Sequence, residues 1–428
     1  MKTWSEAWRM TENGELDSVF KKMGCSDCKK SQSRTLQVLE GFQKSFGEVK
    51  ERKVTLCSAP GRTEIGGNHT DHQRGNVLAA AVTMDFLACA SLNGTKEVRF
   101  QSKGWPLTKV DISKLEVVEA EKESTAALIR GILAKMSESG YKIEGFDLYT
   151  DSEVLPGSGL SSSAACEVMI GVVGNHLFCG DHFNAVEIAK IGQYAENVYF
   201  GKPSGLMDQM ASSVGSAVAI DFKDPKAPVI KPVEVDLEKL GYALCIIDSG
   251  ADHAALTGEY ASIPVEMGAV AGYFGKEVLR DVEEEAFIEA LPEIRKKAGD
   301  RAVLRALHFY AENKRAVEEA EALKKGDMEG FLQLLRESGK SSWELLQNIT
   351  PTGAVEHQDM ALAITIAERL LGKKGACRIH GGGFAGTLQA FVPIEELDSF
   401  REKIEKLLAK GCCHVLDIRN AGGIVVLP

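Results

Sequence analysis

Residues 155–167 read Leu-Pro-Gly-Ser-Gly-Leu-Ser-Ser-Ser-Ala-Ala-Cys-Glu, a glycine-rich turn followed by three hydroxyl side chains. A helical pattern of apolar residues then runs from Ala165 to Leu177. A turn that opens a helix leaves backbone N–H groups without partners inside that helix. These N–H groups and the helix dipole together favour an anion. The stretch therefore predicts a phosphate-binding loop at the start of a helix.

Around this loop, strand-like and helical patterns succeed one another. A strand at 146–150 is expected to feed the loop, and a strand at 54–58 to end at Pro60-Gly61. Further strands are expected at 77–92 (one or two), 217–222, 243–247, 377–379 and 387–392. Helices are expected at 124–139, 184–200 and 283–346, the last broken at Pro292, Gly299 and Gly326. Because the helices are grouped together, this order favours an α+β fold.

The chain length predicts two domains. With 428 residues, the chain exceeds what one hydrophobic core usually holds. Residues 1–33 are polar and predict an exposed helical extension. The domain boundary is placed in a connection rich in Pro, Lys and Asp after Phe222, which gives domains at 34–222 and 223–428.

Composition narrows the classes of partner. The net charge of −11 argues against nucleic acid, whose binding depends on Lys and Arg. No apolar run has the length of a membrane span, and the start of the chain has no signal-like apolar segment. The ten cysteines are scattered, as in a reduced cytoplasmic protein. Cys25 and Cys28 form a single Cys-x-x-Cys, which lacks the second pair that a zinc site needs.

Two nucleotide-binding motifs are matched only superficially. Gly339-Lys340-Ser341 matches the end of a P-loop, but Leu334 stands where that motif needs its first glycine. Residues 381–386 satisfy Gly-x-Gly-x-x-Gly, yet a strand-like segment follows where a Rossmann motif would open a helix. We therefore expect a tight turn between strands there, whose glycines allow a close approach of backbone.

A second segment, residues 59–72, reads Ala-Pro-Gly-Arg-Thr-Glu-Ile-Gly-Gly-Asn-His-Thr-Asp-His. So many polar side chains beside glycines predict recognition of the hydroxyls of a small molecule. A metal site at His69, Asp71 and His72 is an alternative, although their spacing suits neither a helix face nor a sheet face. A solvated loop is a further alternative, weakened by the strands on both sides.

A third segment places Asp208 among apolar residues, in Ser204-Gly205-Leu206-Met207-Asp208-Gln209. A buried carboxylate is costly unless it is paired. A cationic partner is therefore expected, and Arg62 is the candidate. A helix cap or a structural salt bridge is the alternative role for this carboxylate.

Together these segments resemble the GHMP small-molecule kinases and, within them, the galactokinases. Residues 61–71 are similar to the galactokinase signature, 155–164 to the family's phosphate motif and 381–386 to its third motif. Residues 205–209 match the segment that holds the family's catalytic aspartate, and Glu259-Tyr260 is similar to its sugar-contacting tyrosine. The likeness runs from about residue 34 to the end, with the motifs in family order.

The resemblance implies a fold and an activity. The fold would be α+β, with an N-terminal ribosomal-protein-S5-like domain, a C-terminal ferredoxin-like domain and the active site between them. The activity would be transfer of the ATP γ-phosphate, with Mg²⁺, to the anomeric hydroxyl of galactose in the cytoplasm. The oligomeric state is left open, with a monomer favoured.

The resemblance also assigns roles to matching residues. Asp208 would take the proton of the sugar hydroxyl or orient it, and Arg62 would keep Asp208 ionised. Mg²⁺ would be held by Glu196 with Ser163 or Ser162. The sugar would be contacted by Arg62, Glu64, Asn68, His69, Asp71, Asp208 and Tyr260. ATP would be bound by Pro156, Gly157, Ser158, Gly159, Leu160, Ser161, Ser162, Ser163 and Ala164.

The chain departs from the family pattern in the second segment. Galactokinases carry glutamate where this chain has Asn68, asparagine where it has Glu64, and tyrosine where it has His72. The exchange either compensates, with the pair in contact from swapped ends, or alters hydroxyl selectivity. A kinase for another monosaccharide (arabinose-like or a modified hexose) and a non-catalytic sugar sensor therefore stay open. Ser163-Ala164 and Asp208 are present, which favours an enzyme.

Overall fold

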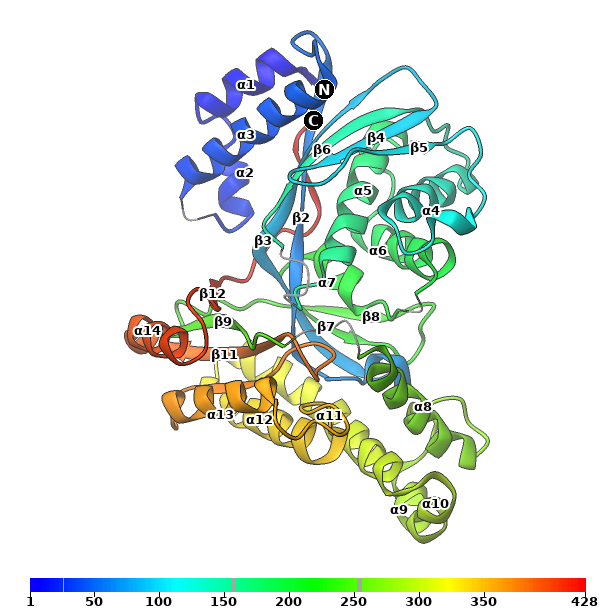
Figure 1. Ribbon diagram of the computed structural model, residues 1–428, viewed down its shortest axis with the longest axis vertical. Coiled ribbons are helices and arrows are strands. Elements are labelled where there is room, and N and C mark those ends of the chain that lie inside the picture. Colours follow the sequence, from blue (N-terminus) through cyan, green and yellow to red (C-terminus); the bar gives the residue numbers. More distant parts are fainter. Residues whose placement is uncertain (26, 155–158, 203, 252–255) are drawn as a thin grey trace.

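Two long antiparallel strands, β2 (Lys53–Gly66) and β3 (Asn76–Leu92), form the spine of the molecule (Figure 1). The computed structural model describes residues 1–25, 27–154, 159–202, 204–251 and 256–428. The expectation that the first strand ends at Pro60-Gly61 was wrong, because β2 continues through it. Its register with β3 shifts between Pro60 and Arg62. Such a bulge accommodates a proline, which has no N–H to donate.

The first sheet is mixed and is built outward from this pair. Its order is β1-β2-β3-β6-β4-β5, with β13 beside β2 and β7 and β8 beside β3. Among the described strands of this sheet, only β4 and β6 are parallel to each other. The added strands are β1 (Lys2–Thr3), β4 (Glu97–Ser102), β5 (Thr108–Asp111), β6 (Phe146–Ser152), β7 (Ala217–Asp221), β8 (Val229–Val233) and β13 (Ile424–Leu427).

Helices cover both faces of this sheet, which is why β2 and β3 are buried at nearly every position (Figure 1). One face carries α4 (Thr125–Glu138), α5 (Ser162–Phe178), α6 (Ala185–Tyr194) and α7 (Met207–Val214). A π-helical segment, Ala195–Phe200, continues α6. The predicted helices at 124–139 and 184–200 are confirmed.

The other face is covered by the N-terminal helices α1 (Trp4–Glu12), α2 (Asp17–Lys22) and α3 (Cys28–Phe46). Trp4 and Phe20 are buried in one cluster with Leu56 and Cys89 of the sheet. The expectation of an exposed extension over residues 1–33 was therefore wrong. Its buried apolar side chains Trp4, Ala7, Leu16, Phe20 and Met23 share one cluster with residues of the sheet, and α3 runs across the expected boundary at 33/34.

The second sheet is antiparallel, in the order β10-β11-β9-β12. Its strands are β9 (Tyr242–Asp248), β10 (Ala376–Ile379), β11 (Thr387–Pro393) and β12 (Cys413–Leu416). The helices of this part are α8 (Thr257–Tyr273), α9 (Glu284–Glu289), α10 (Leu291–Ala298), α11 (Asp300–Lys325), α12 (Met328–Ser341), α13 (Asp359–Leu371) and α14 (Leu397–Leu407), and the π-helical turn Ser342–Leu346 follows α12. The breaks at Pro292, Gly299 and Gly326 and the α+β class are confirmed.

Two strands complicate the expected domain limits. β8 follows the expected boundary at 222/223 but pairs with β7 of the first sheet. β13, at the end of the chain, returns to pair with β2. The division into 34–222 and 223–428 stays a prediction, and these pairings add 229–233 and 424–427 to the first sheet.

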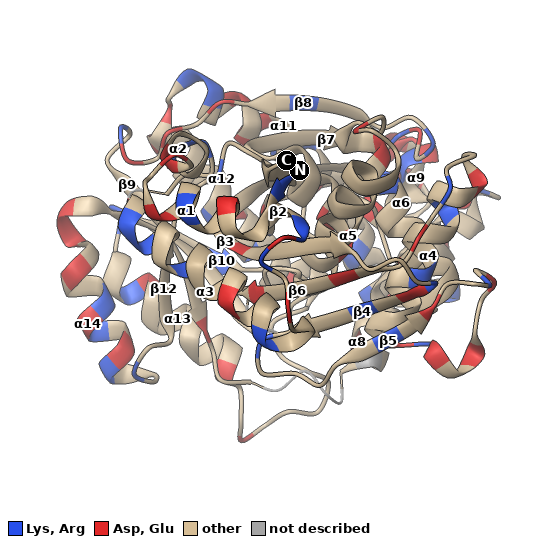
Figure 2. Ribbon diagram, turned by 90° about the horizontal axis from the view of Figure 1, so that it is seen from above, with Lys and Arg blue, Asp and Glu red and all other residues tan. Residues whose placement is uncertain are grey.

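Charge is spread over the molecule. In the view of Figure 2, acidic and basic residues are interspersed over the elements and both occur along α14. None of the helices in the described ranges is long and apolar enough to cross a membrane.

Candidate active site

Arg62 on β2 and Asp208 on α7 form a bidentate ion pair. Arg62 Nε donates to Asp208 Oδ1 at 2.7 Å and Nη2 donates to Oδ2 at 2.8 Å. Two parallel N–H···O bonds fix both position and orientation. The predicted pairing of these two residues, 146 positions apart, is present in the structure.

This pairing sets the protonation state of Asp208. Burial alone would raise its pKa, but the Arg62 charge and hydrogen bonds, with a bond from Ser161, bring the pKa below its usual value. Asp208 is therefore ionised at neutral pH and is a weak base.

The phosphate loop lies against this pair. Arg62 Nη1 donates to the Gly159 carbonyl, and Arg62 N donates to the Leu160 carbonyl at 3.0 Å. Gly159 has φ +71°, and a Cβ there would stand 2.6 Å from Thr387 Oγ1. Glycine is thus needed for both conformation and space. The predicted residues Pro156, Gly157 and Ser158 lie outside the described residues.

Helix α5 begins directly after this loop without a side-chain cap. Its uncapped first turn contains Ser162 and Ser163, and Ala164 behind them is buried. Unpaired N–H groups at such a helix start are a site for an anion. The structure therefore has the local form expected of a phosphate site.

Ser161 makes a contact that the motif did not reveal. It takes a left-handed conformation (φ 56°), and its hydroxyl donates to Asp208 Oδ2 at 2.6 Å. The sequence placed Ser161 only among ATP-binding residues. A serine at positive φ is uncommon, but its partner is 47 residues away and no local signal pointed to it.

Glu196 lies next to the same helix start. Its Oε2 accepts from Ser204 Oγ at 2.5 Å and from Gln209 Nε2 at 2.8 Å. Its Oε1 has only longer contacts, to Ser163 Oγ at 3.5 Å and Lys202 Nζ at 3.4 Å. A weakly partnered carboxylate oxygen beside a hydroxyl is a donor set that fits a hard cation such as Mg²⁺.

Gln209 links Glu196 to a second carboxylate that the sequence did not single out. Its Nε2 also donates to Glu167 Oε2 at 2.9 Å. Burial, followed by the nearby Glu196 carboxylate, raises the pKa of Glu167 well above its usual value. Gln209 thus bridges the buried Glu167 and Glu196 carboxylates.

Asp71 lies beside the segment that carries Asp208. A Cβ on Gly205 would stand 2.2 Å from Asp71 Oδ2, so a larger residue there would displace the Asp71 carboxylate. Burial, then the charges of Glu64 and Asp208, raise the pKa of Asp71 to about 6. The carboxylates of Glu64 and Asp208 are therefore both close to that of Asp71.

Three predicted sugar residues bond to the glycine turn. Asn68 Nδ2 donates to Gly381 O at 2.7 Å, His69 Nε2 to Gly382 O at 2.9 Å and Tyr260 Oη to Gly383 O at 2.9 Å. The turn joins β10 to β11, as the sequence predicted. Contact of these three side chains with a sugar stays a prediction.

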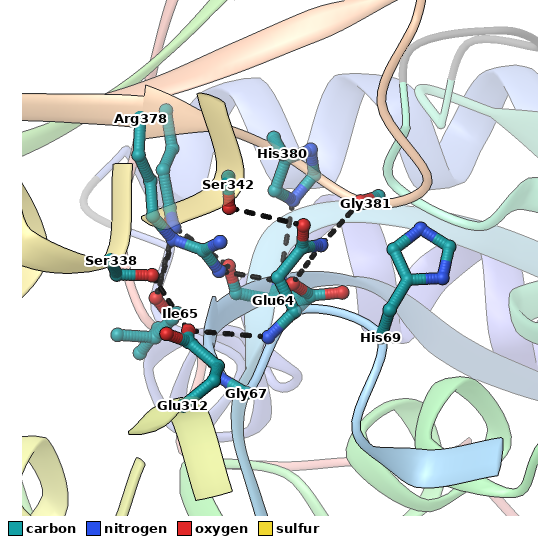
Figure 3. A network of polar contacts seen from close by, with 12 residues as sticks. Glu64, Ile65, Gly67, His69, Glu312, Ser338, Ser342, Arg378, His380 and Gly381 are labelled. Atoms are coloured by element: carbon teal, nitrogen blue, oxygen red, sulfur yellow. Dashed lines mark hydrogen bonds and ion pairs between the residues drawn. The ribbon is translucent and has the colours of Figure 1, made fainter. Parts of the chain in front are cut away.

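The exchanged pair is in direct contact. Asn68 Nδ2 donates to Glu64 Oε1 at 2.9 Å, and Arg378 Nη2 donates to the same oxygen at 3.0 Å. Figure 3 shows Glu64 between Arg378 and His69. The compensating interpretation, a pair in contact from swapped ends, is consistent with this geometry.

The alternative metal interpretation finds no support. The His69 ring donates from Nε2 to a carbonyl, so its Nδ1 accepts from His72 Nε2 at 3.1 Å. Within the described ranges, no cluster of three or more His, Cys, Asp or Glu could hold a metal. All ten cysteines are free, including Cys25 and Cys28.

Two family models match segments of this site. The GHMP kinases N terminal domain matches residues 127–216, which include the loop and Asp208. The Galactokinase galactose-binding signature matches residues 40–92, which include Arg62 and the polar loop.

Whole-chain comparisons agree. The galactokinase of Glaesserella parasuis is 33% identical over 85% of this chain and 91% of its own length, and that of Actinobacillus succinogenes is 31% identical over 88% and 92%. The structure of Lactococcus lactis galactokinase complexed with galactose has a TM-score of 0.76 at 26% identity, covering 90% of this chain and 98% of that one. A D-glycero-D-manno-heptose 1-phosphate kinase, with a TM-score of 0.60, 14% identity and coverage of 87% and 98%, shares the fold. With this fold, this site and relatives matched over most of their length, the chain belongs to the galactokinases of the GHMP kinase family.

Proposed function

We propose that this protein transfers the γ-phosphoryl group of ATP to the anomeric hydroxyl of galactose, giving galactose 1-phosphate and ADP. The observation that carries the proposal is the position of Asp208. It is bonded to Arg62 on one side and to Ser161, the residue before α5, on the other. An acceptor hydroxyl at Asp208 would therefore lie next to the phosphate loop. The relatives named galactokinase support galactose as the acceptor.

The reaction needs positioning and charge compensation more than covalent chemistry. The anomeric oxygen attacks the γ-phosphorus, the bond to ADP breaks and the hydroxyl proton leaves. Because the pKa of Asp208 is low, its carboxylate orients the hydroxyl and accepts the proton late, as the oxygen bonds to phosphorus. Arg62 offsets the charge of the phosphoryl group.

Glu196, with Ser163 or Ser162, would hold Mg²⁺ at the same helix start. The metal supplies charge neutralisation and orientation of the phosphates when bound. Nucleotide sites commonly hold Mg²⁺ by one or two carboxylates together with phosphate oxygens. Gln209 and Ser204 keep Oε2 of Glu196 in place and leave Oε1 toward Ser163.

The test is release of ADP from ATP and Mg²⁺ across a panel of sugars that includes galactose, arabinose-like sugars and modified hexoses. We expect turnover with galactose. Activity only with another sugar would support the alternative monosaccharide kinase, which the Glu64/Asn68 exchange keeps open. Binding of a sugar without any turnover would support the sensor.

The role of Asp208 has its own test. We expect Asp208→Asn to lower kcat by at least about 10³-fold, because the neutral amide can neither accept the proton nor balance Arg62. Nucleotide binding, measured by calorimetry, should change less than about threefold. Retention of turnover by this variant would show that the carboxylate has no part in the chemistry.

A cytoplasmic location is also proposed. It is supported by the ten free cysteines, since cytosolic thiols stay reduced.

A further inference from the structure

The exchanged pair Glu64 and Asn68 allows a sharper assignment, which rests on the proposed function. Glu64 is near the end of β2, and Asn68 follows two residues after that strand ends. The two side chains share a hydrogen bond of 2.9 Å, but they differ in the hydrogen-bonding groups that remain available to a ligand.

The Asn68 amide has no hydrogen-bonding capacity left. Its Nδ2 donates to Glu64 Oε1 at 2.9 Å and to Gly381 O at 2.7 Å. Its Oδ1 accepts from Asn348 Nδ2 at 2.8 Å and from Ser342 Oγ at 3.3 Å. An amide offers two donor hydrogens and two lone pairs. All four are used within the protein, and the residue is 0% exposed.

Glu64 keeps one oxygen available. Its Oε1 accepts from both Arg378 and Asn68. Its Oε2 makes no hydrogen bond with any residue that the structure describes. Oε2 is also absent from the set of fully buried polar atoms that lack a hydrogen-bond partner, so it is not fully buried. The 5% of the side chain that remains exposed therefore includes Oε2.

The surroundings of Glu64 are those of the candidate sugar site. After burial, the charge of Glu64 is the largest cause of the raised pKa of Asp71. Such an effect requires the two carboxylates to be close. Figure 3 also shows His69 on the side of Glu64 opposite Arg378.

We propose that Glu64, and not Asn68, is the specificity-determining residue of this pair: Glu64 Oε2 accepts a hydrogen bond from one hydroxyl of the sugar, while Arg378 and Asn68 hold Oε1. Asn68 is a positioning residue for Glu64 and for the glycine turn. When its hydrogen-bonding hydroxyl is missing, a buried carboxylate costs more binding free energy than a solvated one, because water cannot replace the lost partner. This contact therefore discriminates strongly against a sugar that lacks that hydroxyl.

The test is a cycle between Glu64→Gln and singly deoxygenated galactoses (2-, 3-, 4- and 6-deoxy). Gln keeps an oxygen for Arg378 and Asn68 but places an NH₂ where the acceptor Oε2 stood. We expect KM for galactose to rise about 10- to 100-fold with little change in kcat, since a uniform binding contact is lost. One deoxygalactose should be a much poorer substrate than galactose for the wild-type protein. For Glu64→Gln the same deoxygalactose should be about as good a substrate as galactose, because the contact to that hydroxyl is already lost.

Asn68→Ala is the matched control. Arg378 still holds Glu64 in this variant, so all sugars should lose activity by a similar factor and the preference among them should persist. If this variant does not fold, Asn348→Ala removes one bond to Asn68 and leaves both partners of Glu64 in place.

The outcomes separate the two proposals. Absence of wild-type turnover with galactose overturns the proposed function. Wild-type turnover, with Glu64→Gln retaining the full wild-type discrimination among the deoxygalactoses, overturns the inference alone. A collapse of discrimination in Asn68→Ala or Asn348→Ala, with Glu64→Gln unaffected, also overturns it.

Discussion

Single side chains of this site are placed by residues far away in sequence. Asn68 meets Gly381 across 313 positions and Arg62 meets Asp208 across 146. The ionised or neutral state of each carboxylate follows from these partners. Asp208 has an arginine and a lowered pKa, whereas Asp71 has carboxylate neighbours and a raised one.

At this scale, Asp71 predicts a pH dependence. The family resemblance predicts that Asp71 contacts the sugar, an ionised carboxylate is the stronger hydrogen-bond acceptor, and the pKa of Asp71 is raised to about 6. We expect kcat/KM for galactose to fall as pH drops through 6, by about tenfold per unit below it. Asp71→Asn should lower kcat/KM at pH 8 and remove this limb of the profile. An unchanged limb in the variant would assign it to another group.

The raised pKa of Asp71 also makes the free energy of unfolding depend on pH. A raised folded pKa favours the neutral carboxyl, so the contribution of Asp71 is fully present below its unfolded pKa of about 3.9 and is lost as pH rises through 6. Asp71→Asn should therefore raise Tm at pH 8 relative to the wild-type protein and should not do so at pH 4.

Between elements, helix α11 anchors the loop that follows β2. Glu312 on α11 accepts from Gly67 N at 3.2 Å, Asn68 N at 3.3 Å and Ser338 Oγ at 2.6 Å, and it pairs with Arg315. Burial would raise the pKa of Glu312, but His308, Arg315 and Arg378, with the hydrogen bond from Ser338, lower it to about 2. The helix thus fixes the start of the polar loop by one ionised side chain.

Glu312→Gln tests this anchoring. The lowered pKa stabilises the fold above pH 4.5, and this contribution of about 3 kcal/mol is lost as pH falls from 4.5 toward 2. We expect the variant to lose a similar free energy of unfolding at pH 7 and to depend less on pH in the acid range. Glu321→Gln, at an exposed position of the same helix, is the control and should change stability by less than about 0.5 kcal/mol. Equal effects of the two substitutions would contradict the anchoring role.

For the whole molecule, the N-terminal helices are part of the fold and not an appendage. Phe20 of α2 is 1% exposed and packs in the cluster that includes Leu56 of β2. We expect Phe20→Ala to lower the free energy of unfolding by about 3–5 kcal/mol within a single transition, with kcat and KM unchanged. Lys21→Ala, at the exposed residue next to Phe20, is the control and should change the free energy of unfolding by less than about 0.5 kcal/mol. A separate melting transition for residues 1–46 would show an independent unit.

What could be predicted from sequence was local. The helix start after the loop, the helix breaks, the hairpin turn at 381–386 and the strands near 77–92, 146–150, 217–222, 243–247, 377–379 and 387–392 follow from glycine, proline and apolar periodicity within short windows. The short strands β1, β4, β5, β8, β12 and β13 were not predicted. The cost of burying an unpaired carboxylate added the pairing of Arg62 with Asp208. Pro60-Gly61 was wrongly expected to end a strand, because only the neighbouring β3 shows that a register shift absorbs the proline.

Only the tertiary structure decided how the polar residues share their hydrogen bonds. A list of polar side chains in residues 62–72 predicts a sugar site, but donors and acceptors used inside the protein cannot serve a ligand. Asn68, His69 and Tyr260 each donate to one of three successive carbonyls of the glycine turn, whereas Glu64 keeps an oxygen free. The sequence by itself therefore determined which polar residues gather near the phosphate loop, and three-dimensional contacts decided which of their hydrogen-bonding groups stay available to a ligand.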